Sequence, residues 1–138
     1  MRNRIYGFVA GVVMLTAATL TLSAHHSFSA EFDGSKQVTL EGTVVMMEWV
    51  NPHSWLHLDA KMPDGTIERW KVEGGSPNVL QRLGWTRDSL PAGTKIKVTG
   101  SPAKDGAHRL NSRGIEFPDG RKMSLGGSNP NAENPNDK

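Results

Sequence analysis

Apolar and polar residues alternate along much of this chain with the period of two that is typical of β-strands. In such a strand, one set of side chains faces the core and the other set faces solvent. The alternation predicts five strands, over residues 38–46, 53–60, 67–73, 95–100 and 109–117. Turn sequences rich in Gly, Pro and Asp separate these segments, as expected for strands joined by short connections.

The first predicted strand changes its alternation near its end. Its apolar residues occupy even positions as far as Met46, whereas Met47 and Trp49 occupy odd positions. Such a change indicates a β-bulge, or a strand that leaves the sheet, because one extra residue moves the following side chains to the other face. Asn51-Pro52 then ends the strand.

One helix is predicted, after the third strand. Ser76 is a suitable N-cap, Pro77 fits the first helical position and Gly84 fits the C-terminal end. Three strands, a short helix and two further strands are the order of a five-stranded oligonucleotide/oligosaccharide-binding (OB) barrel. The sequence therefore predicts an all-β domain with one short helix and an OB-like barrel. The alternative is an open β-roll.

The first 24 residues have the pattern of a signal peptide. Arg2 and Arg4 precede an apolar stretch, residues 5–22, that contains no charged residue. Small residues at its end allow cleavage after Ala24 or after Ser23. We therefore expect a periplasmic or secreted protein that has no stable membrane span after cleavage.

The mature chain divides into three parts. Residues 25–37 form a polar N-terminal segment in which Phe28 and Phe32 are candidate anchors onto the barrel. Residues 38–124 hold the predicted barrel domain. Residues 125–138 are rich in Gly, Asn, Pro and Ser, and this composition predicts a disordered tail.

The charge balance argues against a nucleic-acid partner. The whole chain has 16 Lys and Arg residues against 14 Asp and Glu residues, and two of the arginines lie in the leader. The mature domain is therefore neutral, and we expect no nucleic-acid binding. The chain has no Cys, which excludes disulfides, thiolate metal sites and cysteine nucleophiles.

Histidines at the start of the mature chain are candidate copper ligands. If cleavage follows Ala24, the α-amino group and the ring of His25 can chelate Cu(II) as a histidine brace, which needs a further histidine. If cleavage follows Ser23, His26 is the third residue and completes an amino-terminal Cu(II)/Ni(II) motif. The alternative is a flexible N-terminus that binds metal only adventitiously.

His53 and His57 are further candidate metal ligands. They fall on one face of the second predicted strand, about 13 Å apart, so they cannot share a metal on a straight strand. Either histidine can meet His25 if the N-terminal segment crosses that strand. The alternative is an ordinary solvated face.

A second candidate site lies on the outer faces of the second and third predicted strands. Trp55, Arg69 and Lys71 match the surface that OB barrels use for ligands, and a saccharide or a peptide is the expected ligand of an exported protein. The alternative is that Trp55 packs beneath the N-terminal segment or a loop and that the charges are solvated.

A series of short motifs spans the mature chain: His25-His26-Ser27-Phe28, Glu31-Phe32-Asp33, Gly42-Thr43-Val44, Glu48-Trp49, Asn51-Pro52-His53, Ser76-Pro77, Gly84-Trp85 and Asp119-Gly120-Arg121. Together they resemble a family of small exported bacterial proteins known as domain of unknown function 6152. The resemblance covers essentially the whole mature domain. It implies no activity, because none is known for the family.

The sequence has no nucleophile elbow, zinc-protease motif or phosphate-binding loop. We therefore expect an exported binding or accessory domain of unknown ligand, not an enzyme, that binds Cu(II) through His25, His26 and His53. One alternative is a copper-dependent redox enzyme with a His25 brace. Another alternative is a carbohydrate- or peptide-binding module.

Overall fold

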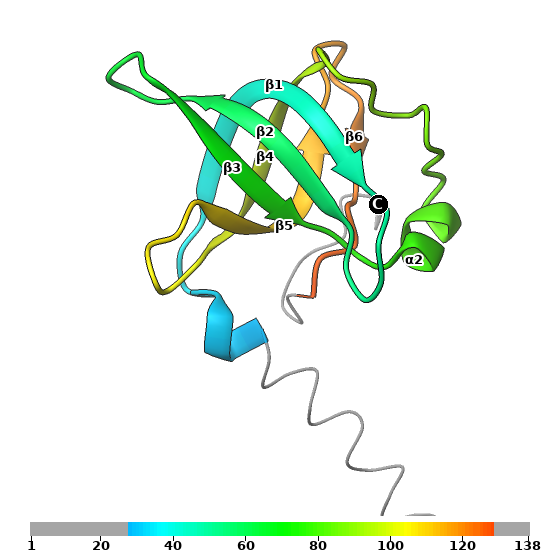
Figure 1. The fold of residues 1–138 in the computed structure, drawn as a ribbon, viewed down its shortest axis with the longest axis horizontal. Coiled ribbons are helices and arrows are strands. Elements are labelled where there is room, and N and C mark those ends of the chain that lie inside the picture. Colours follow the sequence, from blue (N-terminus) through cyan, green and yellow to red (C-terminus); the bar gives the residue numbers. More distant parts are fainter. Residues whose placement is uncertain (1–27, 129–138) are drawn as a thin grey trace, which may run out of the picture.

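The computed structural model describes residues 28–128, which form a β-barrel with a short helix at its side (Figure 1). The elements are β1 (Val38–Glu48), β2 (Trp55–Lys61), β3 (Ile67–Glu73), α2 (Pro77–Arg82), β4 (Lys95–Pro102), β5 (Arg109–Glu116) and β6 (Lys122–Met123). All five predicted strands and the predicted helix are present. The short β6 pairs with the end of β5.

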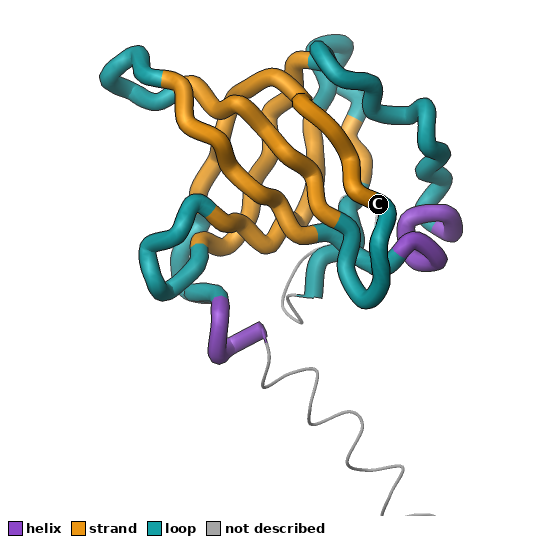
Figure 2. Tube along the Cα trace, in the orientation of Figure 1, coloured by secondary structure: helices purple, strands orange, loops and turns teal. Residues whose placement is uncertain are grey.

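Hydrogen bonds between strands close the barrel, and Figure 2 shows the strands gathered into one curved sheet. β1 pairs antiparallel with β2 and β4, β2 pairs with β3, and β4 pairs with β5. A parallel pairing of β3 with β5 then joins the two open sides. This closed arrangement confirms the OB-like barrel and rules out the open β-roll.

The bulge predicted in the first strand is present. Val44 pairs with Leu58 and Met46 pairs with His57, so Val45 is the extra residue of β1. Val44 is only 2% exposed, whereas Met46, two residues later, is 47% exposed. The bulge therefore exchanges the faces of the strand, as the sequence pattern indicates.

The core follows the alternation of the strands. Leu56, Leu58 and Ala60 of β2 are fully buried, and Leu80 brings the apolar side of α2 onto the same core. Full burial of a leucine side chain contributes about 1.5–3 kcal/mol to the free energy of unfolding. Trp85, which follows α2, is also buried, and its Nε1–H donates to the carbonyl of residue 124 at 2.7 Å.

The second strand begins later than predicted. β2 starts at Trp55, so His53 lies in the preceding loop. This loop is held by the backbone that leaves β3, because Ser54 donates to the carbonyl of Gly75 at 3.0 Å and accepts from the N–H of Gly74 at 2.9 Å. The prediction that His53 and His57 share one strand face is therefore wrong.

The N-terminal segment is anchored as predicted. A helical turn at residues 28–31 places the ring of Phe28 against that of Phe32, with 5.9 Å between ring centroids. Both rings are buried together with Ala103, which belongs to the connection between β4 and β5. The chain therefore enters the barrel domain beside that connection.

The C-terminal residues differ from the prediction. Leu125 is completely buried in the core, and its carbonyl accepts from the N–H of Gly75 at 2.7 Å. The prediction of disorder from residue 125 onwards is therefore wrong for Leu125–Ser128, because one leucine among polar residues suffices to hold the segment. Residues 129–138 and the predicted leader, residues 1–24, lie outside the described residues.

Within residues 28–128, no helix is long and apolar enough to cross a membrane.

The buried position of Leu125 gives a first prediction. We expect Leu125→Ala to lower the free energy of unfolding by about 2–5 kcal/mol, because it leaves a cavity in the core. Val50→Ala, at a residue that is 47% exposed, serves as the control and should change it by less than about 0.5 kcal/mol. Urea denaturation measures both variants. Equal stability of L125A and wild type would contradict the docking of this segment.

Candidate functional site

A row of side chains on the outer face of β2, β3 and β5 forms the centre of the candidate site. In β3, Trp70 and Val72 belong to the core, so alternation places Glu73 on the outer face. The strand pairing sets Trp55 of β2 on one side of Glu73 and Asn111 of β5 on the other side. Three strands thus bring an indole, a carboxylate and an amide into one row.

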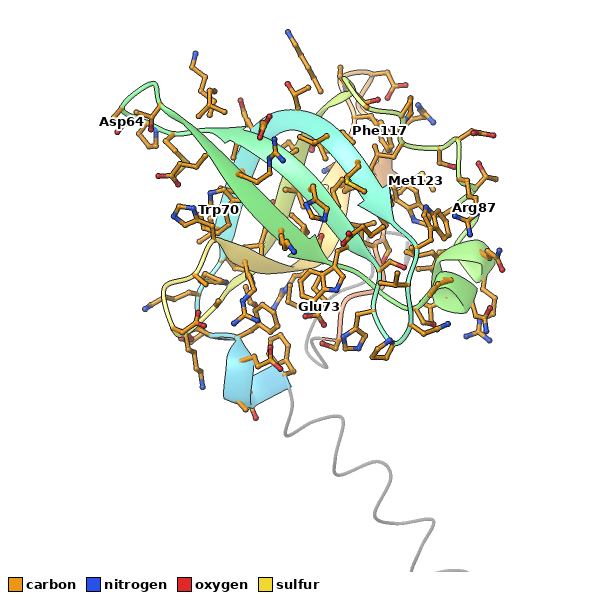
Figure 3. All side chains as sticks on the ribbon, in the orientation of Figure 1. Asp64, Trp70, Glu73, Arg87, Phe117 and Met123 are labelled. Atoms are coloured by element: carbon orange, nitrogen blue, oxygen red, sulfur yellow. The ribbon has the colours of Figure 1, made fainter. Side chains whose placement is uncertain are left out.

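Glu73 is buried, with only 4% of its surface exposed, although it lies on the outer face. His53 covers it from the loop before β2, with 2.9 Å between His53 Nδ1 and Glu73 Oε1. The Nδ2 of Asn111 donates to the same oxygen at 3.3 Å and to the Oγ of Ser128 at 2.9 Å. Figure 3 labels Glu73 near the end of the barrel where the N-terminal helical turn lies.

Glu73 determines which nitrogen of His53 is available to a ligand. A carboxylate beside Nδ1 favours the tautomer that carries its proton there, which leaves a free lone pair on Nε2. The His53 side chain is 36% exposed, so part of the ring has access to solvent. Metal-bound histidines commonly have their second ring nitrogen bonded to a carboxylate in this way.

The charges around Glu73 come from distant parts of the chain. Burial raises the pKa of the Glu73 carboxyl; the neighbouring His53, Arg109 and Asn111 lower it, while the charge of Glu31 raises it further. Arg109 Nη1 lies 3.2 Å from Glu31 Oε2, which ties the N-terminal helical turn to the start of β5. The N-terminal segment therefore lies within electrostatic range of the Glu73 carboxylate.

Two buried polar atoms near this cluster have no hydrogen-bond partner among residues 28–128. They are the Oγ of Ser54 and the Oδ1 of Asn111. A Cβ added at Gly127 would lie 2.7 Å from that Oδ1, so the backbone of the C-terminal segment packs directly against the amide. An unpaired buried acceptor costs about 1–3 kcal/mol, and a water molecule or a ligand that donates a hydrogen bond would recover this energy.

His57, a predicted metal ligand that lies on β2, has a different environment. Its Nε2 lies 2.9 Å from Glu48 Oε2 and its side chain is only 12% exposed. This contact lowers the pKa of the Glu48 carboxyl. The structure therefore pairs His57 with a carboxylate of β1 and keeps it apart from the His53–Glu73 pair.

The predicted ligand-binding residues separate into two groups. Trp55 pairs with Glu73 on the outer face. Lys71, two residues before Glu73 in β3, pairs with His57 of β2. Arg69 is further along β3 and donates from Nε and Nη2 to the two carboxylate oxygens of Asp59, which lowers the pKa of that carboxyl. The charge of Arg69 is thus already compensated, whereas Trp55 and Lys71 lie close to the His53–Glu73 pair.

No group of three or more histidine or acidic residues that could hold a metal ion occurs between residues 28 and 128. His25 and His26 lie outside the described residues. Sequence reasoning missed Glu73 and Asn111, because both are polar residues of strands and the register of β3 against β5 is not visible in the sequence. The pair Gly74-Gly75 after Glu73 is the available signal, since it permits close packing of the covering segments.

The fold places this chain among small OB-like β-barrel domains. In this chain, the buried carboxylate of Glu73 contacts the loop histidine His53. Within that class, the model of a family of unknown function, DUF6152, matches residues 12–112. This match spans more than half of the chain, so the chain belongs to that family, and the resemblance is confirmed over the matched residues. The match ends before Asp119-Gly120-Arg121, and export stays a prediction. No curated protein and no solved structure is significantly similar to the chain.

The raised pKa of Glu73 gives a second prediction. The folded protein binds the Glu73 proton more tightly than the unfolded chain, so this residue's contribution to the free energy of unfolding falls as the pH rises towards the raised pKa. Glu73→Gln removes the charge. We expect the stability of E73Q relative to wild type to increase from roughly pH 4 to pH 7, measured by urea denaturation of metal-free protein.

The matched control for this prediction is Glu41→Gln, at an exposed glutamate of β1. Its stability relative to wild type should show a much smaller dependence on pH over the same range. A constant difference between E73Q and wild type would contradict the effect of burial on Glu73.

Proposed function

We propose that this protein is an exported small binding domain that holds Cu(II) between His53 and the N-terminal residue of the mature chain. The observation that carries the proposal is the contact of His53 Nδ1 with the buried Glu73 carboxylate at 2.9 Å. This contact directs Nε2 outward as a ligand and fixes the orientation of the ring. Cu(II) favours nitrogen ligands in a tetragonal arrangement, which imidazole and a terminal amine supply.

The position of the N-terminal segment supports the assignment of the remaining copper ligands to the residues just before Phe28. Phe28 is anchored, and the nearby Glu31 acts electrostatically on Glu73. His25 precedes Phe28 by three residues, which span up to roughly 10 Å when extended. With cleavage after Ala24, the amine and Nδ1 of His25 would provide two nitrogen ligands and His53 Nε2 a third. With cleavage after Ser23, His26 is the third residue, and its imidazole would bind Cu(II) together with the terminal amine.

His57 has no part in this proposal. Its Nε2 faces Glu48 Oε2 at 2.9 Å without a well-formed hydrogen bond, and its side chain is only 12% exposed. Substitution of His57, on the strand that follows the His53 loop, therefore provides a matched control.

The third prediction tests the ligand set. Protein that starts at His25 is titrated with Cu(II) and followed by electron paramagnetic resonance. We expect one site, and we expect His53→Ala to remove one nitrogen from the copper spectrum and to weaken binding at least tenfold, about the minimum effect seen for groups that support metal ligands. His57→Gln should leave both the spectrum and the affinity unchanged.

Three outcomes would contradict the proposal. Unchanged affinity and spectrum in H53A would exclude the loop histidine. Equal binding by a chain that carries two additional residues before His25 would exclude the terminal amine. The intact mass of protein recovered from the periplasm identifies the first residue, and a mass that retains the leader would contradict export with cleavage.

The fourth prediction tests the anchoring of the N-terminal segment. Phe32 is 2% exposed and packs in a small cluster apart from the main core. Phe32→Ala should therefore release the segment and weaken Cu(II) binding about five- to tenfold, because the two parts of the site lose effective concentration. The control Phe32→Leu keeps most of the apolar contact and should bind nearly as wild type. Equal affinity of F32A and wild type would show that anchoring is irrelevant to the site.

A further inference from the structure

The outer face of β1 and β2 carries a methionine directly opposite a histidine. Met46 of β1 pairs with His57 of β2, immediately after Val45, the extra residue of the bulge. Paired residues of antiparallel strands point to the same face, with about 4.5–5.5 Å between their Cβ atoms. Figure 1 shows the two strands side by side. The bulge therefore places a thioether next to an imidazole.

Met46 is not a core residue. It is 47% exposed, whereas Met47, the next residue, packs against the core. Without the bulge, the alternation that buries Val44 would continue, and Met46 would face the core. A thioether that is half exposed gains little from burial, so packing does not account for its position.

The imidazole of His57 has a nitrogen without a partner. Its Nε2 is buried and forms no hydrogen bond within residues 28–128, although Oε2 of Glu48 is 2.9 Å away. A buried nitrogen in this state is unfavourable, and a metal ion bound to its lone pair would satisfy it. The cross-strand partners of His57 are Met46 and Lys71, whose long side chains can rotate to admit an ion to the ring.

The charges beside His57 are one carboxylate and one ammonium group. Glu48 is two residues after Met46, so it lies on the same face, and its carboxylate contacts the ring. Lys71 is exposed to solvent, and its charge acts on Glu48 more weakly than that of His57 does. The charge nearest to the imidazole is therefore negative, which favours a bound cation.

The donor atoms indicate which cation fits this position. Thioether sulfur is a soft ligand that selects Cu(I), and imidazole also binds copper. Cu(II) instead favours nitrogen and oxygen ligands in a tetragonal arrangement. A methionine opposite a histidine thus differs in chemistry from the nitrogen ligands of the proposed Cu(II) site.

We propose that Met46 and His57 form a Cu(I) site, in which Sδ of Met46 and Nε2 of His57 bind the ion and Glu48 offsets its charge. The site shares no residue with the pair of His53 and Glu73. It needs neither the N-terminal residue nor a change of oxidation state, because the ion binds as Cu(I). Its failure therefore leaves the proposed Cu(II) site untouched.

The experiment is nuclear magnetic resonance of protein that starts at His25 and carries 13C in its methionine methyl groups. This protein retains four of the chain's six methionines: Met46, Met47, Met62 and Met123. Cu(I) is diamagnetic, so every methyl signal stays sharp. Under anaerobic conditions, up to two equivalents of Cu(I) should shift the Met46 signal in a saturable way and leave those of Met62 and Met123 in place.

Two results would overturn this assignment. One is a Met46 signal that does not move, as expected if Cu(I) binds only to the N-terminal histidines. The other is an equal shift of the Met62 and Met123 signals, which would show non-specific binding to thioethers.

Variants test the two ligands separately. His57→Gln should weaken Cu(I) binding, followed at the Met46 signal, at least about tenfold, since even residues that only support metal ligands have effects of this size. Met46→Leu changes an exposed residue, so the fold is kept, and it should remove one Cu(I) ion from the bound stoichiometry measured against a coloured Cu(I) chelator.

Two control variants complete the test. Met62→Leu removes a thioether elsewhere, and His53→Ala removes the proposed Cu(II) ligand. Both should shift the Met46 signal with wild-type affinity. Wild-type affinity in H57Q, wild-type stoichiometry in M46L, or an equal loss in M62L would contradict the Cu(I) site.

Discussion

The parallel pairing of β3 with β5 is the contact on which the other features of this structure depend. It closes the sheet into a barrel, and through its register it sets Glu73 beside Asn111. Without it, Glu73 would be an ordinary outward glutamate on an edge strand. With it, the carboxylate lies beside Asn111, His53 of the loop before β2 covers it, and Asn111 is in turn bonded to Ser128 of the C-terminal segment.

Burial of a carboxylate is unfavourable unless hydrogen bonds and neighbouring charges compensate for it. Here the compensation comes from His53 and Asn111, with Arg109 as a more distant positive charge. The arrangement constrains His53, because the ring must keep Nδ1 towards the carboxylate. A histidine fixed in this way is better prepared to bind a metal than one free to rotate, since less rotamer entropy is lost on binding.

The sequence was sufficient to predict the strands, the helix, the bulge in β1 and the anchoring by Phe28 and Phe32, because each depends on local periodicity or capping. The sequence was insufficient to predict the environment of Glu73 and His53. The burial of Glu73 depends on a register between strands more than thirty residues apart in the chain, as the pairing of Glu73 with Asn111 shows. The docking of Leu125 was missed for a related reason, since a single apolar residue gives no periodic signal.

The most direct test of the central claim is a crystal structure of protein that starts at His25, with one equivalent of Cu(II). The account predicts copper bound to Nε2 of His53 and to the terminal amine and Nδ1 of His25, with the contact between His53 Nδ1 and Glu73 retained. Copper bound at His57 or His108, or a copper site at the N-terminus that excludes His53, would contradict it.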